Sequence, residues 1–365
     1  MKIFTKKLYA KKRCNIIFDM DNSEILAKAK EILGRDLTCI VPFEHLDFSC
    51  DGSVFPCCPA LIDKYSFGDI FKDKSVDKIW NGEKAQEFRR SILDGSFQYC
   101  RLDSCLNLSN IKYDDRYNKD LSNKSLISDL PKEIYFHIDS ACNVRCITCR
   151  DEKVFMTEFA NQYEKILDSV MVPFAKNART VYFNGAGEIF ASKLCKNLIQ
   201  KLTEAYPDLK FNLITNGILA TKENIELYGL KNKILSIEVS MHAVTKETYD
   251  KIVRGGDFDA VMKNLKMLSE MKKNGEIKYL WLNYVVTSYN YKEMINFQKL
   301  ADELGAYTRF WEYRKWGTAE LDNRYDEVAI FEPTHPDYDK YLEVVKDKIF
   351  DEENCCINYK LRPFN

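Results

Sequence analysis

The sequence predicts an α/β fold in which parallel strands alternate with helices, preceded by a small cysteine-rich module and followed by a C-terminal extension. Three observations support this prediction: apolar β-rich runs recur through the second half, helical patterns separate them, and cysteines cluster near the N-terminus. Repeated strand–helix units indicate parallel strands with right-handed crossovers. A chain of 365 residues suits one large α/β domain with an appended module.

Six strands are expected in the second half, at residues 133–139, 180–184, 210–215, 234–241, 278–287 and 307–311. Helices are expected between them, including 154–170, with Phe155 and Tyr163 on one apolar face, and 257–273, starting at Asp257. From the pattern alone, six units could close into a barrel or remain an open sheet. In both cases function is expected at the carboxyl ends of the strands.

The first hundred residues follow a different pattern. Asp51-Gly52 between two alternating runs predicts a hairpin, and residues 75–92 predict one or two short helices. Polar residues from about 110 to 130 suggest a linker. We therefore expect an N-terminal lead (1–38), a cysteine-rich module (39–110), a linker (111–130), a core domain (131–311) and a C-terminal extension (312–365).

Composition narrows the function classes. With 54 basic and 55 acidic residues, nothing predicts nucleic acid or an anionic membrane surface as a partner. No apolar run approaches the ~20 residues of a membrane span, and the basic start lacks the apolar segment of a secretory signal, so we expect a cytoplasmic protein. Thirteen cysteines in a reducing compartment indicate metal binding, and four histidines argue against a histidine-rich zinc or copper site.

Three cysteines, Cys142, Cys146 and Cys149, follow the first core strand. A structural zinc site uses four protein ligands, whereas iron–sulfur clusters are held by cysteine thiolates. Three thiolates would leave one iron of a 4Fe-4S cluster open to a non-protein ligand, which suggests an enzyme. The alternative at this point is three buried or zinc-bound cysteines.

The spacing Cys142-x3-Cys146-x2-Cys149 resembles the signature of the radical S-adenosylmethionine (radical SAM) enzymes, and the resemblance covers residues 133 to about 311. It implies a partial (β/α)6 TIM-like barrel, a 4Fe-4S cluster on these cysteines, and SAM bound at the open iron. It further implies reductive cleavage of SAM to a 5′-deoxyadenosyl radical, which abstracts a hydrogen atom from the substrate. The SAM contacts that it implies are Gly185, Gly187, Glu188, Thr215, Asn216, Ser240, Arg254 and Asn283.

In the family these positions have distinct roles. The resemblance implies that Glu188 and its glycine turn hold the amino group of SAM, and that Arg254 pairs with its carboxylate. Ser240 would contact the carboxylate or ribose, and Asn283 the adenine or ribose. One departure is Thr148, because the residue before the third cysteine is usually aromatic and packs on the adenine.

The N-terminal cysteines carry a second resemblance. Cys39-x12-Gly52-x4-Cys57, followed by Cys100 and Cys105, is similar to the opening of the SPASM module. The resemblance implies an auxiliary 4Fe-4S cluster on Cys39, Cys57, Cys100 and Cys105, with Cys50 and Cys58 left over. The module here precedes the barrel, which departs from the usual order. Since four thiolates also fit zinc, a zinc ribbon is the alternative.

The resemblance implies an electron donor such as flavodoxin or ferredoxin, but leaves the reaction outcome open. No peptide-binding domain fits in the 38 residues before Cys39, so we expect oxidation or epimerisation of a small or carbohydrate-like substrate. A peptide-modifying maturase is the alternative. A non-catalytic iron–sulfur electron carrier or binding protein is the alternative of another class. Cys355 and Cys356 receive no role.

Overall fold

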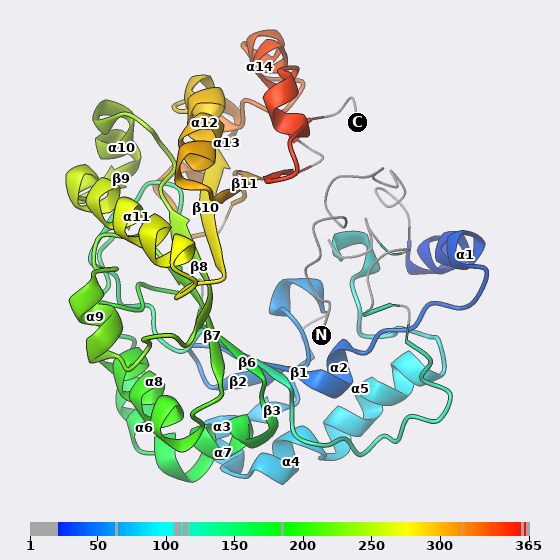
Figure 1. Ribbon diagram of the computed structural model, residues 1–365. Coiled ribbons are helices and arrows are strands. Elements are labelled where there is room, and N and C mark those ends of the chain that lie inside the picture. The colour runs from blue at the N-terminus through cyan, green and yellow to red at the C-terminus, as the bar shows by residue number, and fades with distance from the viewer. Residues whose placement is uncertain are drawn as a thin grey trace. The chain divides into compact units, whose positions relative to one another are not determined.

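The structure is a computed structural model that describes residues 21–62, 65–105, 111, 116–117, 119–183, 186–315, 317–358 and 361–362. The chain divides into two compact units. The first comprises residues 1–138, 158–182 and 204–209, and the second comprises residues 139–157, 183–203 and 210–365. Each unit contains strands and the helices that pack on them (Figure 1).

The first unit contains strands in the order β6-β4-β1-β2-β3. The predicted hairpin is present, because β1 pairs antiparallel with β2 and Gly52 lies in the turn at φ 87°. On its other side β1 runs parallel to β4, with Phe48 opposite Phe136, so the cysteine-rich module adds a strand to the parallel sheet. The strand bounds are β1 His45–Phe48, β2 Ser53–Phe55, β3 Gly68–Asp69, β4 Glu133–Phe136 and β6 Thr180–Phe183.

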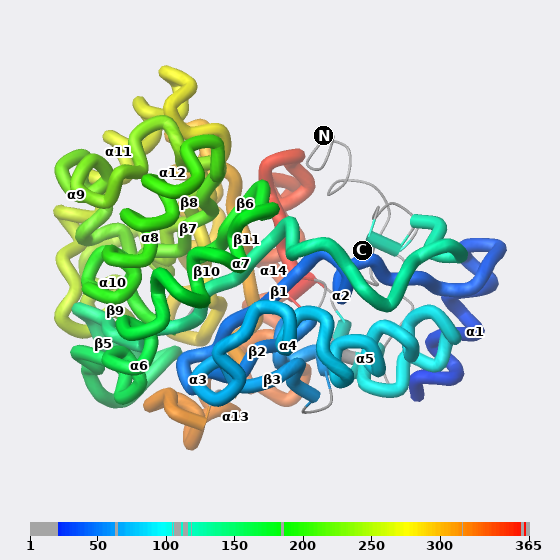
Figure 2. The backbone as a smooth tube through the Cα atoms, turned by 90° about the horizontal axis from the view of Figure 1, so that it is seen from below, coloured from blue at the N-terminus to red at the C-terminus, as the bar shows by residue number. Residues whose placement is uncertain are grey.

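Short helices surround these strands. Figure 2 shows α3 and α4 beside the strands of the module. The core of this unit includes Phe48, whose ring lies 5.4 Å from that of Phe136 and 5.3 Å from that of Phe174. The helical segments are α1 Asn22–Leu33, α2 Val41–Glu44, η1 Pro59–Leu61, α3 Ile70–Asp73, α4 Val76–Trp80, α5 Glu83–Leu93, η2 Leu102–Ser104, α6 Ala160–Glu164, η4 Leu167–Met171, α7 Val172–Phe174 and η5 Ala175–Asn177.

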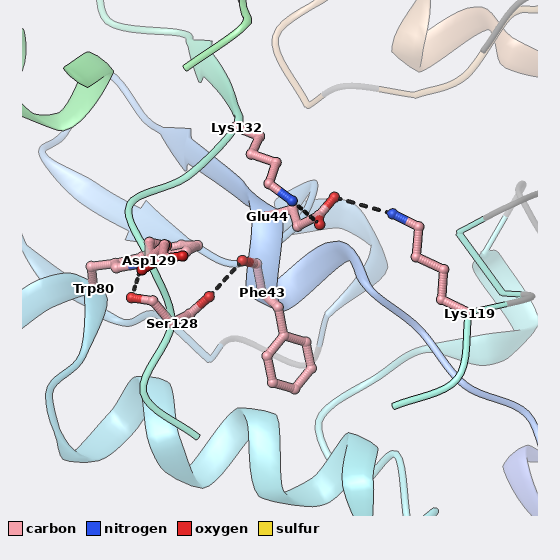
Figure 3. Close-up of polar contacts among 7 residues, drawn as sticks. All are labelled: Phe43, Glu44, Trp80, Lys119, Ser128, Asp129 and Lys132. Carbon is pink, nitrogen blue, oxygen red and sulfur yellow. Dashed lines mark hydrogen bonds and ion pairs between the residues drawn. The ribbon is translucent and has the colours of Figure 1, made fainter. Parts of the chain in front are cut away.

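The polar segment before β4 contains no helix or strand at residues 119–132, but it is anchored to the module (Figure 3). Trp80 Nε1 donates to the Asp129 carbonyl at 2.8 Å, and the Ser128 hydroxyl donates to the Phe43 carbonyl at 2.8 Å. The carboxylate at the end of α2 pairs with two lysines of this segment: Glu44 with Lys119 and Lys132. These contacts hold the start of β4 against the module.

Arg89 of α5 is a fully buried cation at the centre of this anchor. Its Nε donates to the Pro42 carbonyl at 2.9 Å, and its Nη1 donates to Asn81 Oδ1 at 3.1 Å and to the Leu126 carbonyl at 3.0 Å. The guanidinium also lies 4.4 Å from the centre of the Trp80 ring. Burial lowers the pKa of Arg89 to about 10. One side chain therefore joins α2, α4, α5 and the polar segment.

The second unit contains strands in the order β12-β11-β10-β8-β7, and every neighbouring pair is parallel. Helices α8, α9, α11 and α12 lie on one side of the strands (Figure 1). None of the described helices is long and apolar enough to cross a membrane. The strands are β5 Arg145–Cys146, β7 Lys210–Thr215, β8 Ile234–Ser240, β9 Val253–Arg254, β10 Tyr279–Val286, β11 Tyr307–Glu312 and β12 Cys355–Ile357. The helical segments are α8 Lys193–Ala205, α9 Lys222–Leu227, α10 Lys246–Ile252, α11 Phe258–Lys273, η6 Tyr291–Glu293, α12 Met294–Leu304, η7 Glu320–Arg324, α13 Tyr325–Val328, α14 Tyr338–Val345 and η8 Lys348–Asp351.

The six core strands expected from the sequence are β4, β6, β7, β8, β10 and β11, each within a few residues of its predicted range. The α/β fold class is therefore confirmed. Two parallel pairings were not expected: β1, predicted only as a hairpin strand, pairs with β4, and the unpredicted strand β12 of the C-terminal extension pairs with β11. Strand β12 contains Cys355 and Cys356, so these cysteines belong to a sheet edge.

The predicted helix over residues 154–170 is wrong. The segment forms only α6 and the π-helical η4, and Phe155 is 85% exposed. The cause lies in the residues just before α6. The Val154 carbonyl accepts from Cys142 N at 2.7 Å, and Thr157 N donates to Asp139 at 3.0 Å. These backbone groups hold the cysteine segment and are therefore lost to a helix.

We expect Arg89→Ala to lower the free energy of unfolding by about 3 kcal/mol, because it leaves buried carbonyls without their donor and removes the packing on Trp80. Arg90→Ala is the matched control, since Arg90 is exposed on the same helix and should change stability by under about 0.5 kcal/mol. Chemical denaturation at equal metal content measures both. Equal losses in the two variants would show that the buried network does not anchor the module.

Candidate functional site

The three clustered cysteines lie in a segment that we call the cysteine loop, residues 139–151. Its centre forms the short strand β5, which pairs antiparallel with β9 so that Cys146 lies opposite Val253. Ile147 N donates to the Ile252 carbonyl at 3.0 Å, and Cys149 N donates to the Cys146 carbonyl at 3.0 Å. The loop is therefore held by backbone pairing.

Asp139 organises the start of the cysteine loop. Its side chain is buried, and its carboxylate accepts from Ala141 N and Thr157 N at 3.0 Å each and from the Ser192 hydroxyl at 2.6 Å. Three donors around one buried carboxylate fix the backbone just before Cys142. This role of Asp139 was not predicted, because an aspartate at the end of a strand is common in turns.

Gly187 explains why the turn after β6 needs glycine. A Cβ at this position would lie 2.3 Å from the Ala141 carbonyl oxygen and 2.8 Å from that of Asp139. Glu188 N donates to the same Ala141 carbonyl at 2.7 Å. The backbone at Gly187 therefore packs directly against the backbone of the cysteine loop. Gly185, the other predicted glycine, lies outside the described residues.

Glu188 connects the turn after β6 to the turn after β7. Its carboxylate is buried and accepts from Thr215 Oγ1 at 2.7 Å, Asn216 N at 2.6 Å and Phe190 N at 3.2 Å. Burial raises the pKa of Glu188, and these donors oppose the rise. Both carboxylate oxygens are thus engaged within the protein. The structure shows Glu188 as a link between loops, a role that its place in the motif did not indicate.

Asn216 brings the end of β7 to the cysteines. Its Nδ2 donates to Asn143 Oδ1 at 2.8 Å and lies 4.0 Å from Cys142 Sγ. Thr215 Oγ1 accepts from Gly217 N at 3.0 Å, which fixes the turn. Of the predicted contacts, Gly187, Glu188, Thr215 and Asn216 therefore gather at the cysteine loop.

Of the other predicted contacts, two lie on strands β8 and β10 of the large sheet and one lies on β9. Ser240 and Asn283 are partners on β8 and β10, and Asn283 Oδ1 is buried without a hydrogen-bond partner. Arg254 pairs through its backbone with Arg145 of the cysteine loop, but its guanidinium bonds to both oxygens of Glu320, at 2.6 and 2.7 Å. Its side chain is 44% exposed.

Arg150, which directly follows the third cysteine, faces the same site. Its Nη1 donates to the Ser140 carbonyl and its Nη2 to the Ala186 carbonyl, each at 2.6 Å. Burial disfavours the charged guanidinium, yet the neighbouring thiolates, Cys149 first, raise the pKa of Arg150. The residue therefore ties the cysteine loop to the turn after β6 and places a positive charge among the thiols. Arg150 was not predicted as a site residue, although its position directly after the third cysteine could have indicated it.

The chemistry of the thiols fits an iron–sulfur cluster. Burial raises the pKa of Cys146, and the nearby Cys149 and Cys142 raise it further, so cluster binding must displace protons. Among the described residues, no three histidine, cysteine or acidic side chains converge on a point as the ligands of a single metal ion would. Thiolates of a cubane bind different irons and need not converge. The orphaned Asn283 Oδ1 on β10 also suits a polar ligand.

The four predicted auxiliary cysteines come together in the first unit. Burial raises the pKa of Cys39, Cys57 and Cys100, and in each case other cysteines of this group add to the rise. Every pair within the group interacts in this way, Cys105 included. Tyr117 adds a phenol whose oxygen lies 3.2 Å from Cys105 Sγ, a neighbour that the sequence did not reveal.

The cysteines left over by the prediction behave differently. Cys50 Sγ donates to the His137 carbonyl at 2.9 Å, and Cys58 is exposed next to Cys57. Cys195 is buried in α8. Cys39, Cys57, Cys100 and Cys105 therefore form one set of partly buried, mutually interacting thiols, and Cys58 also acts on its neighbour Cys57.

Comparison with known proteins finds two family matches along the chain. Residues 138–301 match the radical SAM superfamily, and residues 39–106 match SPASM, an iron–sulfur cluster-binding domain. The chain is 30% identical over 190 residues to a GTP 3′,8-cyclase of Petrotoga mobilis, covering 50% of this chain and 56% of the cyclase. It is 26% identical over 145 residues to the subtilosin biosynthesis protein AlbA of Bacillus subtilis, covering 39% of this chain and 31% of AlbA.

Among solved structures, anSMEcpe with bound AdoMet superposes with a TM-score of 0.38 at 17% identity, covering 62% of this chain and 61% of that one. The chain spans 56% of the cyclase and 31% of AlbA, so the activities of those whole proteins are not assigned to this chain. The radical SAM domain implies a 4Fe-4S cluster and SAM, and the SPASM domain implies an auxiliary iron–sulfur cluster. The chain belongs to the radical SAM superfamily and carries its SPASM domain before the radical SAM domain.

Proposed function

We propose that this radical SAM enzyme binds SAM at a 4Fe-4S cluster held by Cys142, Cys146 and Cys149, and acts on a small polar substrate. When bound, SAM and the reduced cluster supply a 5′-deoxyadenosyl radical that takes a hydrogen atom from the substrate. The reaction outcome that we propose is oxidation or epimerisation. A flavodoxin or ferredoxin is the proposed electron donor.

The convergence of three segments carries this proposal: the cysteine loop, the turn after β6 and the turn after β7. Gly187 packs without a side chain against Ala141, and Glu188 fixes the position of Asn216, which lies 4.0 Å from Cys142 Sγ. Precise placement of this kind is what a protein contributes when a cofactor supplies the chemistry. We also propose the domain limits expected from the sequence, residues 39–110 for the cysteine-rich module and 131–311 for the core domain.

We assign the SAM contacts by their location. Gly187, Thr215 and Asn216 border the cysteine loop, and Ser240 and Asn283 follow along the sheet. Gly185 and Glu188 complete the proposed set, Glu188 by holding the two turns together. Arg254 would reach the SAM carboxylate only by leaving Glu320, so we propose that this ion pair exchanges when SAM binds.

A second cluster is proposed for Cys39, Cys57, Cys100 and Cys105. Their mutual electrostatic interaction and burial support a fully ligated auxiliary cluster, which would transfer electrons or anchor substrate. Zinc is the competing occupant, since four thiolates suit both.

The relatives favour two substrate classes. Similarity to a GTP 3′,8-cyclase supports a small-molecule substrate. Similarity to AlbA, a bacteriocin biosynthesis protein, supports peptide modification as the second candidate function. Incubation of the reduced enzyme with SAM should yield 5′-deoxyadenosine. If no 5′-deoxyadenosine forms, the protein is a non-catalytic iron–sulfur protein.

We expect Cys146→Ala to lower the iron content by about four atoms per chain and to abolish 5′-deoxyadenosine formation, because a cubane missing one of three protein ligands is not retained. Cys195→Ala removes a buried cysteine away from the site and should keep both properties. Iron analysis and chromatography of anaerobically reconstituted protein measure the effect. Unchanged iron in Cys146→Ala would refute the cluster assignment.

Cys100→Ala should remove the auxiliary cluster and about half of the total iron, since two cubanes hold about eight irons. Cys58→Ala, which changes an exposed cysteine beside Cys57, is the control and should retain all of it. Metal analysis for iron and zinc distinguishes the occupants. If Cys100→Ala loses one zinc per chain and keeps its iron, these four cysteines hold zinc and not an iron–sulfur cluster.

Gly187→Ala should reduce iron retention at the catalytic site at least about fivefold, because the new Cβ would displace the backbone of the cysteine loop. Gly275→Ala is the control for backbone strain away from the site, because Gly275 has φ 78° and a Cβ there meets no atom within 4 Å. Both variants are compared by iron per chain after identical reconstitution. A wild-type iron content in Gly187→Ala would show that the cysteine loop tolerates the added Cβ. The close approach at Gly187 would then not be needed to hold the cluster.

A further inference from the structure

One face of the strands in the first unit is lined with polar and aromatic side chains that neither cluster uses. Residues on this face alternate with core residues, as the half-buried and buried positions of β4 and β6 show. The pairing of β1 with β4 places His45 opposite Glu133 and Asp47 opposite Tyr135. Residues that share this face are His45, Asp47, Glu133, Tyr135, His137, Thr180 and Tyr182.

Aromatic rings form a stacked platform on this face. Tyr135 and Tyr182 are parallel within 6°, with ring centres 4.0 Å apart. On the other side of Tyr135 the His45 ring lies 4.4 Å away at 36°. Because the rings stack on one another, the row presents ring edges and not ring faces to a ligand, and these edges combine C–H groups with polar atoms.

Asp47 and His45 carry buried polar atoms without partners. Asp47 is 1% exposed, and its Oδ1 has no hydrogen-bond partner although His137 Nε2 lies 3.4 Å away. His45 Nε2 also has none, and it lies 4.0 Å from Asp47 Oδ2. Leaving such atoms unsatisfied is costly, and proteins retain them where function requires it.

Solvent reaches this face beside the unsatisfied atoms. The side chain of His45 is 13% exposed and that of His137 is 27% exposed, whereas Asp47 between them is buried. The unsatisfied atoms are themselves buried, next to two imidazoles that are partly exposed. A ligand that enters from solvent could accept from or donate to both.

The charges on this face suit a neutral ligand. Burial lowers the pKa of His45 to about 3, so this imidazole is neutral. Burial raises the pKa of Asp47 and of Glu133, and Arg116 provides a positive charge that acts on His45 and Glu133. A triphosphate needs several cations, and the seven residues of this face include two carboxyl groups and no lysine or arginine.

We propose that this face binds a neutral, polyhydroxylated ring compound of the carbohydrate class. The ring lies against the edges of Tyr135 and Tyr182, and Asp47 Oδ1 and His45 Nε2 bind its hydroxyl groups. A sugar or cyclitol has hydroxyls that donate and accept hydrogen bonds, which matches the polar ring edges and the two orphaned atoms. The inference rests on the proposed function, because it names the substrate class of the same enzyme.

The SPASM domain would then take part in substrate binding directly. His45 and Asp47 lie on β1, within residues 39–106 that match this domain, whereas Tyr135 lies on β4 and Tyr182 on β6. The parallel pairing of β1 with β4 is what places these side chains on one face. The site therefore exists only because the module contributes a strand.

Saturation-transfer NMR on the anaerobic, cluster-loaded protein tests the proposal with methyl α-D-glucopyranoside, methyl α-D-mannopyranoside and myo-inositol as probes. We expect at least one to bind, and Asp47→Asn and His45→Phe to weaken that binding at least about tenfold. Asp77→Asn, an exposed aspartate of α4, is the control and should bind as the wild type does. Binding of none of the probes, or equal binding by Asp47→Asn, overturns the proposal.

A stability measurement separates a ligand-binding role from a structural one. If Asp47 serves binding, Asp47→Asn should leave the melting temperature equal or higher and the iron content unchanged, because it removes an unsatisfied buried carboxylate. A large loss of stability would show a structural role and overturn the proposal. Binding of GTP or of a 15-residue peptide that depends on Asp47, in place of the polyols, overturns the substrate class.

Failure of this inference is distinguishable from failure of the proposed function. Formation of 5′-deoxyadenosine without added substrate reports SAM cleavage alone and does not depend on this face. If it forms while no polyol binds, the inference fails and the proposed function stands. If polyols bind through Asp47 and no 5′-deoxyadenosine forms, the binding site stands and the proposed function fails.

Discussion

The site depends on one close approach, between the turn after β6 and the backbone of the cysteine loop. Gly187 has no Cβ, and this allows Glu188 N to reach the Ala141 carbonyl. The Asp139 carboxylate accepts a hydrogen bond from Ala141 N at the start of the same loop. The Glu188 carboxylate accepts one from Asn216 N and so holds the turn after β7. The thiols of the loop are therefore positioned by buried hydrogen bonds between neighbouring segments, which is the kind of support that a precisely placed metal site needs.

Charge is organised around both sets of thiols by burial. Buried thiols have raised pKa values, so binding of a cluster is coupled to proton release, and a nearby cation favours the thiolate form. In the second unit Arg150 supplies that cation and also bonds to Ala186. In the first unit Arg116 acts on Cys39, and Tyr117 lies against Cys105. Both sites thus combine thiols whose pKa is raised by burial with a nearby arginine, although the residues differ.

The N-terminal module is part of the folded core of its unit. It gives β1 to the parallel sheet, and the buried Arg89 joins its helices to the polar segment that leads to β4. That segment was expected to be a linker, and its polar composition is correct for one. Its backbone carbonyls are used by Arg89 and Trp80, so it acts as a strap that holds the module to β4.

The sequence by itself determined the six core strands, the helices near residues 75–92 and 257–273 and the grouping of the cysteines, because periodicity, caps and ligand spacing are local properties. Helix α11 behind Asp257 and the hairpin at Gly52 are examples. Only the tertiary structure decided the pairing of β1 with β4, the loss of helix at residues 154–157 and the link made by Glu188. Each of these depends on groups far apart in the chain, whose hydrogen bonds and close packing outweigh local propensity and leave no mark in a short window of sequence.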